Sequence, residues 1–460
     1  MTRRSLFSAA FVFVFAFTLS QLSHAQTLAA TPPMGWNSWD AYGFTIDETD
    51  FKANATVLAG MKEFGWQYMV IDEGWYMQNL KGSNLAERKY LLNGNGILVP
   101  VASRFPDSGD GAGFKPLADW VHAQGLKFGI HVIRGIPRDA VTANLPIAGT
   151  NFHAADAADT TDACPWDDGN WGMNDNAAGQ AYYDAMLKLY AGWGLDFIKV
   201  DCISNHTYRP TEIRQIAEAI RKTGRPIVLS LSPGPTALEN AAVVSEYAQM
   251  WRITDDHWDG WTFPHKPDEG EYPFGLKGSF DRLAKWFTYA KPGNWPDPDM
   301  LPEGWLGPHP GMGEARASRL THDEQQFEFT LWSIARAPMI MCGNLTKLDD
   351  FTRSLMTNQT LLFINQNATY GHPVTAAGLP ENTRVWRATI NAPGAKNYQE
   401  FFGFFNLDDQ PVTLHATWKQ LGLEGGKHLA QNIWTEGGYK ESKGVNITLP
   451  AHGSTLFELR

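Results

Sequence analysis

Acidic side chains recur at one kind of position in this 460-residue chain, where a short apolar run ends. The acids concerned are Asp72, Glu73, Asp201, Asp255, Asp256, Asp297 and Asp299. Burying an ionised carboxylate is costly unless it is paired or hydrogen-bonded, so this repeat is not expected of a packed interior. If the runs are parallel strands of one barrel, their carboxyl ends meet on one face, and the pattern predicts a shared acidic site there.

A cluster of carboxyl groups suits cleavage of a glycosidic bond. One acid protonates the leaving oxygen, while another attacks the anomeric carbon or activates water. Lys199 lies two residues before Asp201 and so on the same strand face, where its ammonium would keep Asp201 ionised, as a nucleophile requires. Arg252 precedes Asp255 and Asp256, and spacing alone leaves either acid as the proton donor.

Other catalytic chemistries are less well supported. Cys202 and His206 would make a thiol site, but an export signal and a disulfide argue against it. No G-x-S-x-G, H-E-x-x-H or P-loop motif is present. His131 and His257 belong to no regular metal-binding motif, so sugar-binding or structural roles are expected for them, without a metal or cofactor.

The elements that would position these acids alternate along the chain. Short β-like runs span 34–42, 68–76, 126–133, 196–203, 226–233, 249–256 and 338–346, with a weaker run before 296–301. Amphipathic stretches such as 113–125 and 209–224 separate them. Eight such units predict a parallel (β/α)₈ barrel. A doubly wound sheet is the competitor, but it usually carries a Gly-rich phosphate loop, which this chain lacks.

One long stretch, 134–177, interrupts the alternation and is rich in Gly, Asp and Asn. In a barrel it would lie on the active face. Its acids, which suggest a calcium site, are Asp156, Asp159, Asp162, Asp167 and Asp168. Because their spacing matches no EF-hand loop, we expect a solvated loop without a metal.

The charge and the N-terminus restrict partners and location. A formal net charge of -11 lacks the basic footprint of nucleic-acid binding and has the wrong sign for an anionic membrane surface. Residues 1–25 resemble an export signal, with Arg3 and Arg4 before a short apolar run and a small-x-small motif ending at Ala25. We expect a secreted or periplasmic protein without membrane contact after cleavage; an uncleaved anchor is the alternative.

Export permits disulfide bonds. Cys164 and Cys202 both fall in predicted active-face loops and are expected to pair, whereas Cys342 lies in an apolar run and is expected to be a buried free thiol.

After about residue 375 the pattern changes to period-two alternation. The runs span 383–390, 400–407, 411–418 and 446–460. They predict a small antiparallel β-sandwich. We therefore divide the chain into a signal peptide (1–25), a catalytic barrel (26–372) and a C-terminal β-sandwich (373–460) that packs tightly on the barrel.

Five motifs together resemble glycoside hydrolase family 27, which holds α-galactosidases and α-N-acetylgalactosaminidases. They are TPPMGWNSWDAYG, VIDEGW, FIKVD, WRITDD and NWPDPDML, in the family's order within about 31–370. The resemblance implies that Asp201 is the nucleophile and that Asp256, rather than Asp255, is the acid/base. The residues it places around the sugar are Trp39, Asp72, Glu73, His131, Lys199, Ser232, Arg252, Asp299 and Met300.

Three positions depart from the usual α-galactosidase pattern. Glu73 stands where Asp is usual, and its longer side chain would enter the space of the sugar's hydroxymethyl group; members acting on β-L-arabinopyranosides resemble this chain there. Ser232 replaces a Glu near the sugar's second hydroxyl, as in N-acetylgalactosaminidases, and His131 replaces a common Tyr. Unpaired buried polar groups alter selectivity strongly, so these positions bear on the sugar rather than on the mechanism.

The predicted function is thus a secreted retaining exo-glycosidase that removes terminal α-D-galactosyl residues from oligosaccharides or glycoconjugates. β-L-Arabinopyranosidase or α-N-acetylgalactosaminidase specificity on the same scaffold is the alternative. A catalytically silent carbohydrate-binding protein is a more remote one, since a lectin needs neither Asp201 nor Asp256.

Overall fold

The structure is a computed structural model that describes residues 27–80, 88–264, 270–308, 312–391, 396, 398–424, 426–435 and 437–460. The predicted export signal lies outside the described residues. Within the described ranges, no helix is both long enough and apolar enough to cross a membrane.

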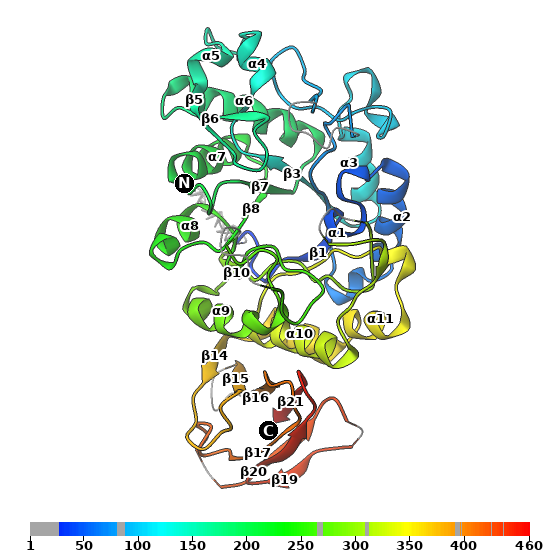
Figure 1. Ribbon diagram of the computed structural model, residues 1–460, viewed down its shortest axis with the longest axis vertical. Coiled ribbons are helices and arrows are strands. Elements are labelled where there is room, and N and C mark those ends of the chain that lie inside the picture. Colours follow the sequence, from blue (N-terminus) through cyan, green and yellow to red (C-terminus); the bar gives the residue numbers. More distant parts are fainter. Residues whose placement is uncertain are drawn as a thin grey trace, which may run out of the picture.

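Eight parallel strands form the centre of the larger domain (Figure 1). They are β1 (Met34–Asn37), β2 (Tyr68–Ile71), β3 (Lys127–Ile133), β7 (Phe197–Asp201), β8 (Val228–Leu231), β9 (Met250–Arg252), β10 (Trp295–Asp297) and β13 (Met339–Met341). Their order is β10-β9-β8-β7-β3-β2-β1-β13, and a parallel bridge from Leu301 to Met341 links the two edge strands. The predicted (β/α)₈ barrel is confirmed.

Helices surround these strands (Figure 1). They include α2 (Glu48–Ala59), α3 (Lys115–Ala123), α6 (Ala177–Trp193), α7 (Pro210–Thr223), α8 (Ala241–Tyr247), α9 (Ser279–Trp286), α10 (His322–Ala335), α11 (Asp350–Met356) and α12 (Gln359–Asn367). Helix α7 shows why they form. Proline opens its first turn, Ile213, Ile216 and Ile220 are buried at helical spacing, and Gly224 ends it in the left-handed conformation.

The strands are shorter than the apolar runs that predicted them. The run 34–42 is a strand only to Asn37 and then turns into helix α1 (Trp39–Tyr42). The run 68–76 likewise ends as a strand at Ile71. In both, the residues beyond the strand are buried or partly buried, so apolar composition alone did not reveal where strand pairing stops.

The stretch 134–177 is folded rather than an open loop. It contains helices α4 (Arg138–Thr142) and α5 (Ala154–Ala157) and a three-stranded antiparallel sheet of β4 (Ile136–Pro137), β6 (Asn170–Met173) and β5 (Ala158–Ala163). We name this stretch the β3–α6 excursion; it lies at one rim of the barrel (Figure 1). Across the described ranges no group of three or more His, Cys, Asp or Glu could hold a metal ion.

The C-terminal domain is antiparallel, as predicted. Its strands are β14 (Tyr370–Val374), β15 (Thr383–Ile390), β16 (Gln399–Asn406), β17 (Val412–Thr417), β18 (His428–Asn432), β19 (Lys440–Ser442), β20 (Gly444–Leu449) and β21 (Ser454–Leu459). They form a six-stranded sheet, β14-β15-β16-β21-β18-β19, and the pair β17–β20. The run 446–460 is two strands, not one, and β14, β18 and β19 were not predicted. The expected division at 372/373 falls inside β14.

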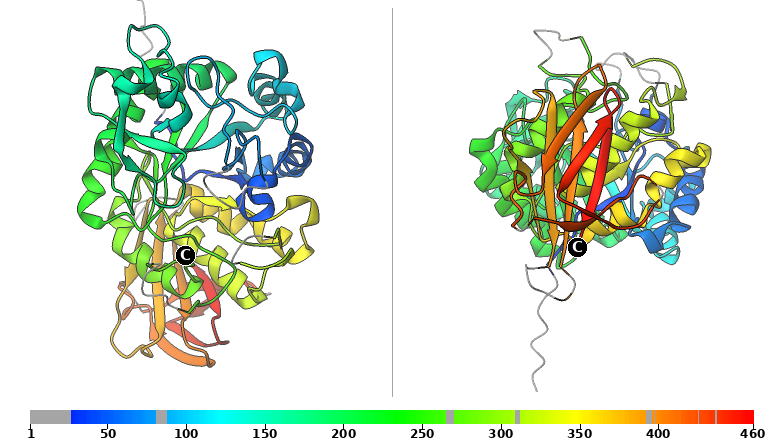
Figure 2. Two further views of the ribbon diagram at one scale, coloured as in Figure 1. Left: turned by 45° about the horizontal axis from the view of Figure 1, so that its top comes forward. Right: turned by 90° about the horizontal axis from the view of Figure 1, so that it is seen from below.

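This domain packs against the barrel through α10, as Figure 2 shows from below. Phe327 of α10 lies edge-on to Phe405 of β16, with ring centroids 5.0 Å apart. The Gln326 side chain donates a hydrogen bond of 2.9 Å to the carbonyl of Ser454.

Candidate active site

A cavity opens at the carboxyl ends of the barrel strands. Its walls are formed by Trp39, Asp40, Asp72, Glu73, Trp166, Lys199, Asp201, Asp256, His257, Trp258, Asp299 and Met300. The structure therefore brings together every predicted site residue except His131, Ser232 and Arg252, which do not line this cavity. Because strands β1, β2, β7, β9 and β10 all end here, the acids that recur along the sequence meet in space.

Two of the three remaining residues lie directly behind the cavity wall. His131 of β3 is buried, and its Nε2 is 3.2 Å from Oδ2 of Asp201. Nη2 of the buried Arg252 is 2.7 Å from Oδ2 of Asp299 and 3.1 Å from Oδ1 of Asp256. Ser232 is buried after β8. Its contact with a sugar stays a prediction.

Asp201 is held as an anion. Burial alone would raise the pKa of its carboxyl, but His131, Lys199 and the Cys202 N–H together lower it. The N–H of Cys202 donates to Oδ1 at 2.6 Å. An ionised carboxylate with one oxygen fixed by its own backbone is ready to act as a nucleophile.

Asp72 and Lys199 form a buried ion pair beside Asp201. Oδ2 of Asp72 accepts hydrogen bonds from Asn37 Nδ2 at 2.7 Å and from Lys199 Nζ at 2.9 Å. Burial opposes both charges, yet Lys199 and His131 lower the pKa of Asp72, while Asp72 and Asp201 raise the pKa of Lys199. Both groups stay charged and can bind the hydroxyls of a sugar.

The neighbours Asp255 and Asp256 have different surroundings. The Asp255 side chain is 5% exposed; its Oδ1 lies 2.8 Å from His206 Nε2, and its Oδ2 accepts from the N–H of Glu271 at 2.9 Å. The Asp256 side chain is 40% exposed and has Arg252 as its ion-pair partner. Asp255 is thus engaged in holding a loop, and Asp256 is the acid available to a ligand.

Glu73 lies against the wall of the cavity next to Asp72. Its Oε1 is 3.6 Å from Arg88 Nη1, and its carboxyl faces that of Asp167. Burial and the Asp167 carboxylate raise the pKa of Glu73 well above its usual range. Burial beside a second carboxylate therefore favours the neutral form of Glu73.

His257, for which the sequence indicated a sugar-binding or structural role, also lines the cavity, whereas sequence reasoning missed three of its residues: Asp40, Trp166 and Trp258. Each lies within two residues of a residue that was singled out, so proximity to Trp39, Cys164 or Asp256 was the available signal. The cysteine predictions hold. Cys164 and Cys202 form a disulfide with Cα atoms 5.9 Å apart, and Cys342 is a buried free thiol that donates to Oδ2 of Asp40 at 3.0 Å.

A (β/α)₈ barrel whose strand ends bring together carboxyl groups of lowered and of raised pKa, with a lysine and an arginine beside them, has the fold and the site of a barrel glycoside hydrolase. Comparison with known proteins indicates which family of barrel glycoside hydrolases the chain belongs to. The family model "Alpha galactosidase A" matches residues 167–367. The α-galactosidase A of Cellvibrio japonicus (strain Ueda107) is 30% identical over 453 residues, covering 94% of this chain and 93% of that one.

Two further relatives have different named activities. The crystal structure of a family 27 β-L-arabinopyranosidase from Geobacillus stearothermophilus is 39% identical with a TM-score of 0.85, covering 94% of this chain and 97% of that one. A variant of that enzyme has been solved with arabinose. The α-N-acetylgalactosaminidase of Gallus gallus is 27% identical over 74% of this chain and 71% of its own length. The chain belongs to glycoside hydrolase family 27 and is an α-galactosidase-type glycoside hydrolase.

Proposed function

We propose that this protein is a retaining exo-glycosidase that removes terminal pyranosides of the galactose configuration and prefers β-L-arabinopyranosides to α-D-galactosides. The observation that carries the preference is the buried Glu73 in the wall of the cavity. L-Arabinopyranose has the ring configuration of D-galactose but lacks the hydroxymethyl group. The relative at 39% identity, named as a β-L-arabinopyranosidase, supports the same choice.

The surroundings of Glu73 explain why it would select against galactose. The side chain is buried, with Arg88 Nη1 3.6 Å from Oε1 and the carboxyl of Asp167 beside it, so packing restricts its movement within the wall. Relative to aspartate it adds one methylene to the wall that would face the hydroxymethyl group. A methylene of misfit in a closed pocket costs about 1–3 kcal/mol, or roughly 10–200-fold in selectivity.

The chemistry would be a double displacement. Asp201 attacks the anomeric carbon while Asp256 gives a proton to the leaving oxygen, and a glycosyl ester forms on Asp201. Asp256 then takes a proton from water as that water attacks the anomeric carbon, which breaks its bond to Asp201 and releases the carboxylate. The lowered pKa of Asp201 and the exposure of Asp256 support these roles.

α-D-Galactosidase activity is the second candidate, favoured by the Cellvibrio japonicus relative at 30% identity. The sequence of residues 1–25 supports secretion or a periplasmic location for either activity. A sugar-binding protein without turnover is disfavoured because both Asp201 and Asp256 line the cavity.

The test is a comparison of para-nitrophenyl β-L-arabinopyranoside, α-D-galactopyranoside and α-N-acetylgalactosaminide with wild type, Glu73→Asp and the exposed-site control Glu63→Asp. We expect the arabinoside to have the highest kcat/KM in wild type. Glu73→Asp should shift the arabinoside-to-galactoside ratio toward galactoside by about 10-fold or more, since one methylene is removed. A wild-type preference for galactoside that Glu73→Asp leaves unchanged would refute the role of Glu73. Proton NMR of the first product should show the retained anomer.

A further inference from the structure

One peptide group carries Asp256, the proposed acid/base, into the cavity, and hydrogen bonds hold this peptide on both sides. The carbonyl of Asp256 accepts a hydrogen bond of 2.8 Å from the N–H of Phe274. The N–H of the next residue, His257, donates to Oδ2 of Asp299 at 2.7 Å. Because the plane of the peptide decides where the Asp256 side chain points, whatever fixes the plane also fixes the proton donor.

The imidazole of His257 provides a third hold on this peptide. The residue is 1% exposed, and its Nε2 lies 2.7 Å from Oε1 of the buried Glu328. The indole of Trp332, one turn further along α10, packs against the imidazole with ring centroids 5.8 Å apart. Helix α10 lies between the barrel and the C-terminal domain (Figure 1). The ring is therefore attached to a long packed helix rather than to another loop.

The polar groups around this contact are buried without a strong cation. The carboxyl of Glu303, which is 1% exposed, lies against that of Glu328. Among the described residues neither acid has a lysine or arginine within ion-pair distance, and His257 is the ion-pair partner of Glu328. Buried polar groups of this kind often stabilise a protein no better than apolar side chains of the same volume. Natural proteins accept them chiefly at functional sites, and the functional residue adjacent in the chain is Asp256.

We propose that Glu328 is a positioning residue for the acid/base. Through His257 it holds the peptide that carries Asp256, so that the Asp256 carboxyl meets the oxygen of the leaving group. The proposal rests on the proposed function, in which Asp256 protonates that oxygen, and deepens it. Glu328 does not itself line the cavity. Because a misplacement of about 1 Å can cost on the order of 10²-fold in rate, loss of this anchor should appear in proton transfer.

The nucleophile is held by different contacts. Nε2 of His131 is 3.2 Å from Asp201, and the N–H of Cys202 donates to Asp201 at 2.6 Å. None of these three residues belongs to α10 or to the segment that follows β9. Loss of the Glu328 contact should therefore slow a reaction that needs a proton on the leaving oxygen and leave one that needs none largely unchanged.

The experiment compares two glycosides of the sugar that wild type prefers, with aglycones of similar shape. The 2,4-dinitrophenolate leaves without a proton, whereas the oxygen of the phenyl glycoside needs one. Glu328→Leu removes the contact with His257. Glu328→Gln keeps it, because an amide can donate to Nε2 or accept from it. Phe327→Leu, on the same helix but facing the C-terminal sheet, is the control. Unfolding temperatures show which variants fold, and His257→Phe tests the same contact if Glu328→Leu does not.

We expect Glu328→Leu to lower kcat/KM for the phenyl glycoside about 10-fold more than for the dinitrophenyl glycoside. Glu328→Gln should restore the wild-type ratio of the two values. Phe327→Leu should lower the unfolding temperature and leave that ratio unchanged. Equal losses on both substrates, a Glu328→Gln ratio as low as that of Glu328→Leu, or the same change of ratio in Phe327→Leu would each overturn the proposal.

A double variant tests whether Glu328 acts through the acid/base. In an Asp256→Ala background, Glu328→Leu should have no further effect on the ratio, because the proton donor is already gone. A further 10-fold change there would show that Glu328 acts by another route and would overturn the proposal. If wild type hydrolysed neither glycoside, the proposed function would fail instead.

Discussion

Asp201 and Asp256 face the same cavity, but their surroundings suit them to different tasks. Asp201 is partly buried among His131, Lys199 and the Cys202 N–H, which lower its pKa although desolvation would raise it. Asp256 is two-fifths exposed, and Arg252 is its charged partner. A nucleophile should stay ionised, whereas an acid/base must exchange protons with the leaving oxygen and with water, so each residue has the access that its proposed role needs.

For these two residues we predict that Asp201→Ala abolishes turnover even of activated aryl glycosides, because no glycosyl ester can form. Asp256→Ala should lower kcat/KM by about 10²–10⁴-fold on a poor leaving group and much less on a good one. Azide should rescue Asp256→Ala with an activated substrate and should not rescue Asp255→Ala. The checks are steady-state kinetics and identification of the glycosyl azide. Rescue of Asp255→Ala alone would move the acid/base role to Asp255.

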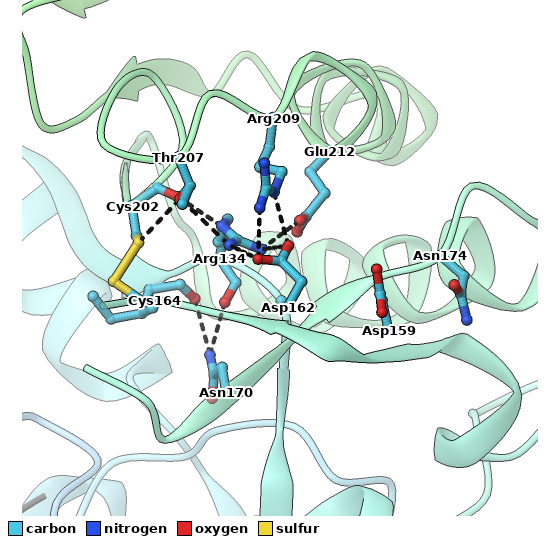
Figure 3. Close-up of polar contacts among 12 residues, drawn as sticks. Arg134, Asp159, Asp162, Cys164, Asn170, Asn174, Cys202, Thr207, Arg209 and Glu212 are labelled. Atoms are coloured by element: carbon cyan, nitrogen blue, oxygen red, sulfur yellow. Dashed lines mark hydrogen bonds and ion pairs between the residues drawn. A yellow bond between two sulfur atoms is a disulfide. The ribbon is translucent and has the colours of Figure 1, made fainter. Parts of the chain in front are cut away.

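The strands and helices of the barrel are supported near the site by the β3–α6 excursion. Arg134, which directly follows β3, links three segments: its Nε donates to the carbonyl of Cys202 at 2.7 Å, and its Nη1 donates to Glu212 of α7 at 2.7 Å and to Asp162 of β5 at 2.9 Å (Figure 3). The Tyr183 hydroxyl of α6 donates to the same Glu212. One buried guanidinium thus connects the excursion, the turn after Asp201 and helix α7, and α6 is joined to it through Glu212.

We predict that Arg134→Met lowers the free energy of unfolding by about 3–5 kcal/mol, because it leaves Glu212 buried without a cation. The matched control is Arg214→Met, which removes an exposed arginine paired with Asp175 and Glu218 and should cost at most about 1 kcal/mol. Urea unfolding followed by tryptophan fluorescence measures both. If the two variants unfolded at the same urea concentration, Arg134 would not be the link described.

In the whole molecule, α10 joins the two domains and reaches the site. One face packs on the C-terminal sheet through Phe327, and the next residue, Glu328, places Oε1 2.7 Å from His257 Nε2 in the barrel. Glu328 also contacts the buried carboxyl of Glu303. Burial raises the pKa of Glu328 to about 8 and lowers that of His257 to about 4, so burial favours the neutral form of both side chains.

This pair makes stability depend on pH in a defined direction. The folded protein binds the Glu328 proton more tightly than the unfolded chain does, since the pKa is about 8 rather than the ordinary 4.5 of a glutamate side chain. The stability that the Glu328 proton contributes is fully present below the pKa of the unfolded chain. It is lost as pH rises through the folded pKa of about 8. Glu303, whose pKa is also raised by burial, acts in the same direction, while Asp299 and Glu324 are the nearby acids that disfavour ionisation further.

We therefore predict that the unfolding temperature of wild type falls between pH 6 and about pH 9 more steeply than that of Glu328→Gln, because the amide mimics the protonated acid and cannot ionise. Differential scanning calorimetry across this range gives both slopes. Glu218→Gln, on helix α7 and paired with Arg214, is the control. Parallel slopes for wild type and Glu328→Gln would show that Glu328 does not titrate in this range.

Most of the fold and of the site could be read from the pattern of residues. Alternating apolar runs and amphipathic stretches predicted a barrel. The carboxylates that follow the runs predicted a shared site at the carboxyl ends of the barrel strands. Residues such as Asp72, Lys199 and Asp201 were found because strand period and strand end are local properties. The sandwich strand β18 was missed because its burial, with Leu429 exposed, does not follow a clean alternation.

The sequence by itself determined the architecture and the types of chemical group at the barrel mouth, because both follow from periodicity and from the cost of isolated buried charge. Only the tertiary structure decided which acids are free and which are engaged. Asp255 and Asp256 are neighbours in the chain, yet His206 and the Glu271 backbone engage one and leave the other open. The surroundings of Trp166 and Glu328 likewise depend on tertiary contacts. These distinctions depend on segments that meet only in the folded chain, and no local pattern records them.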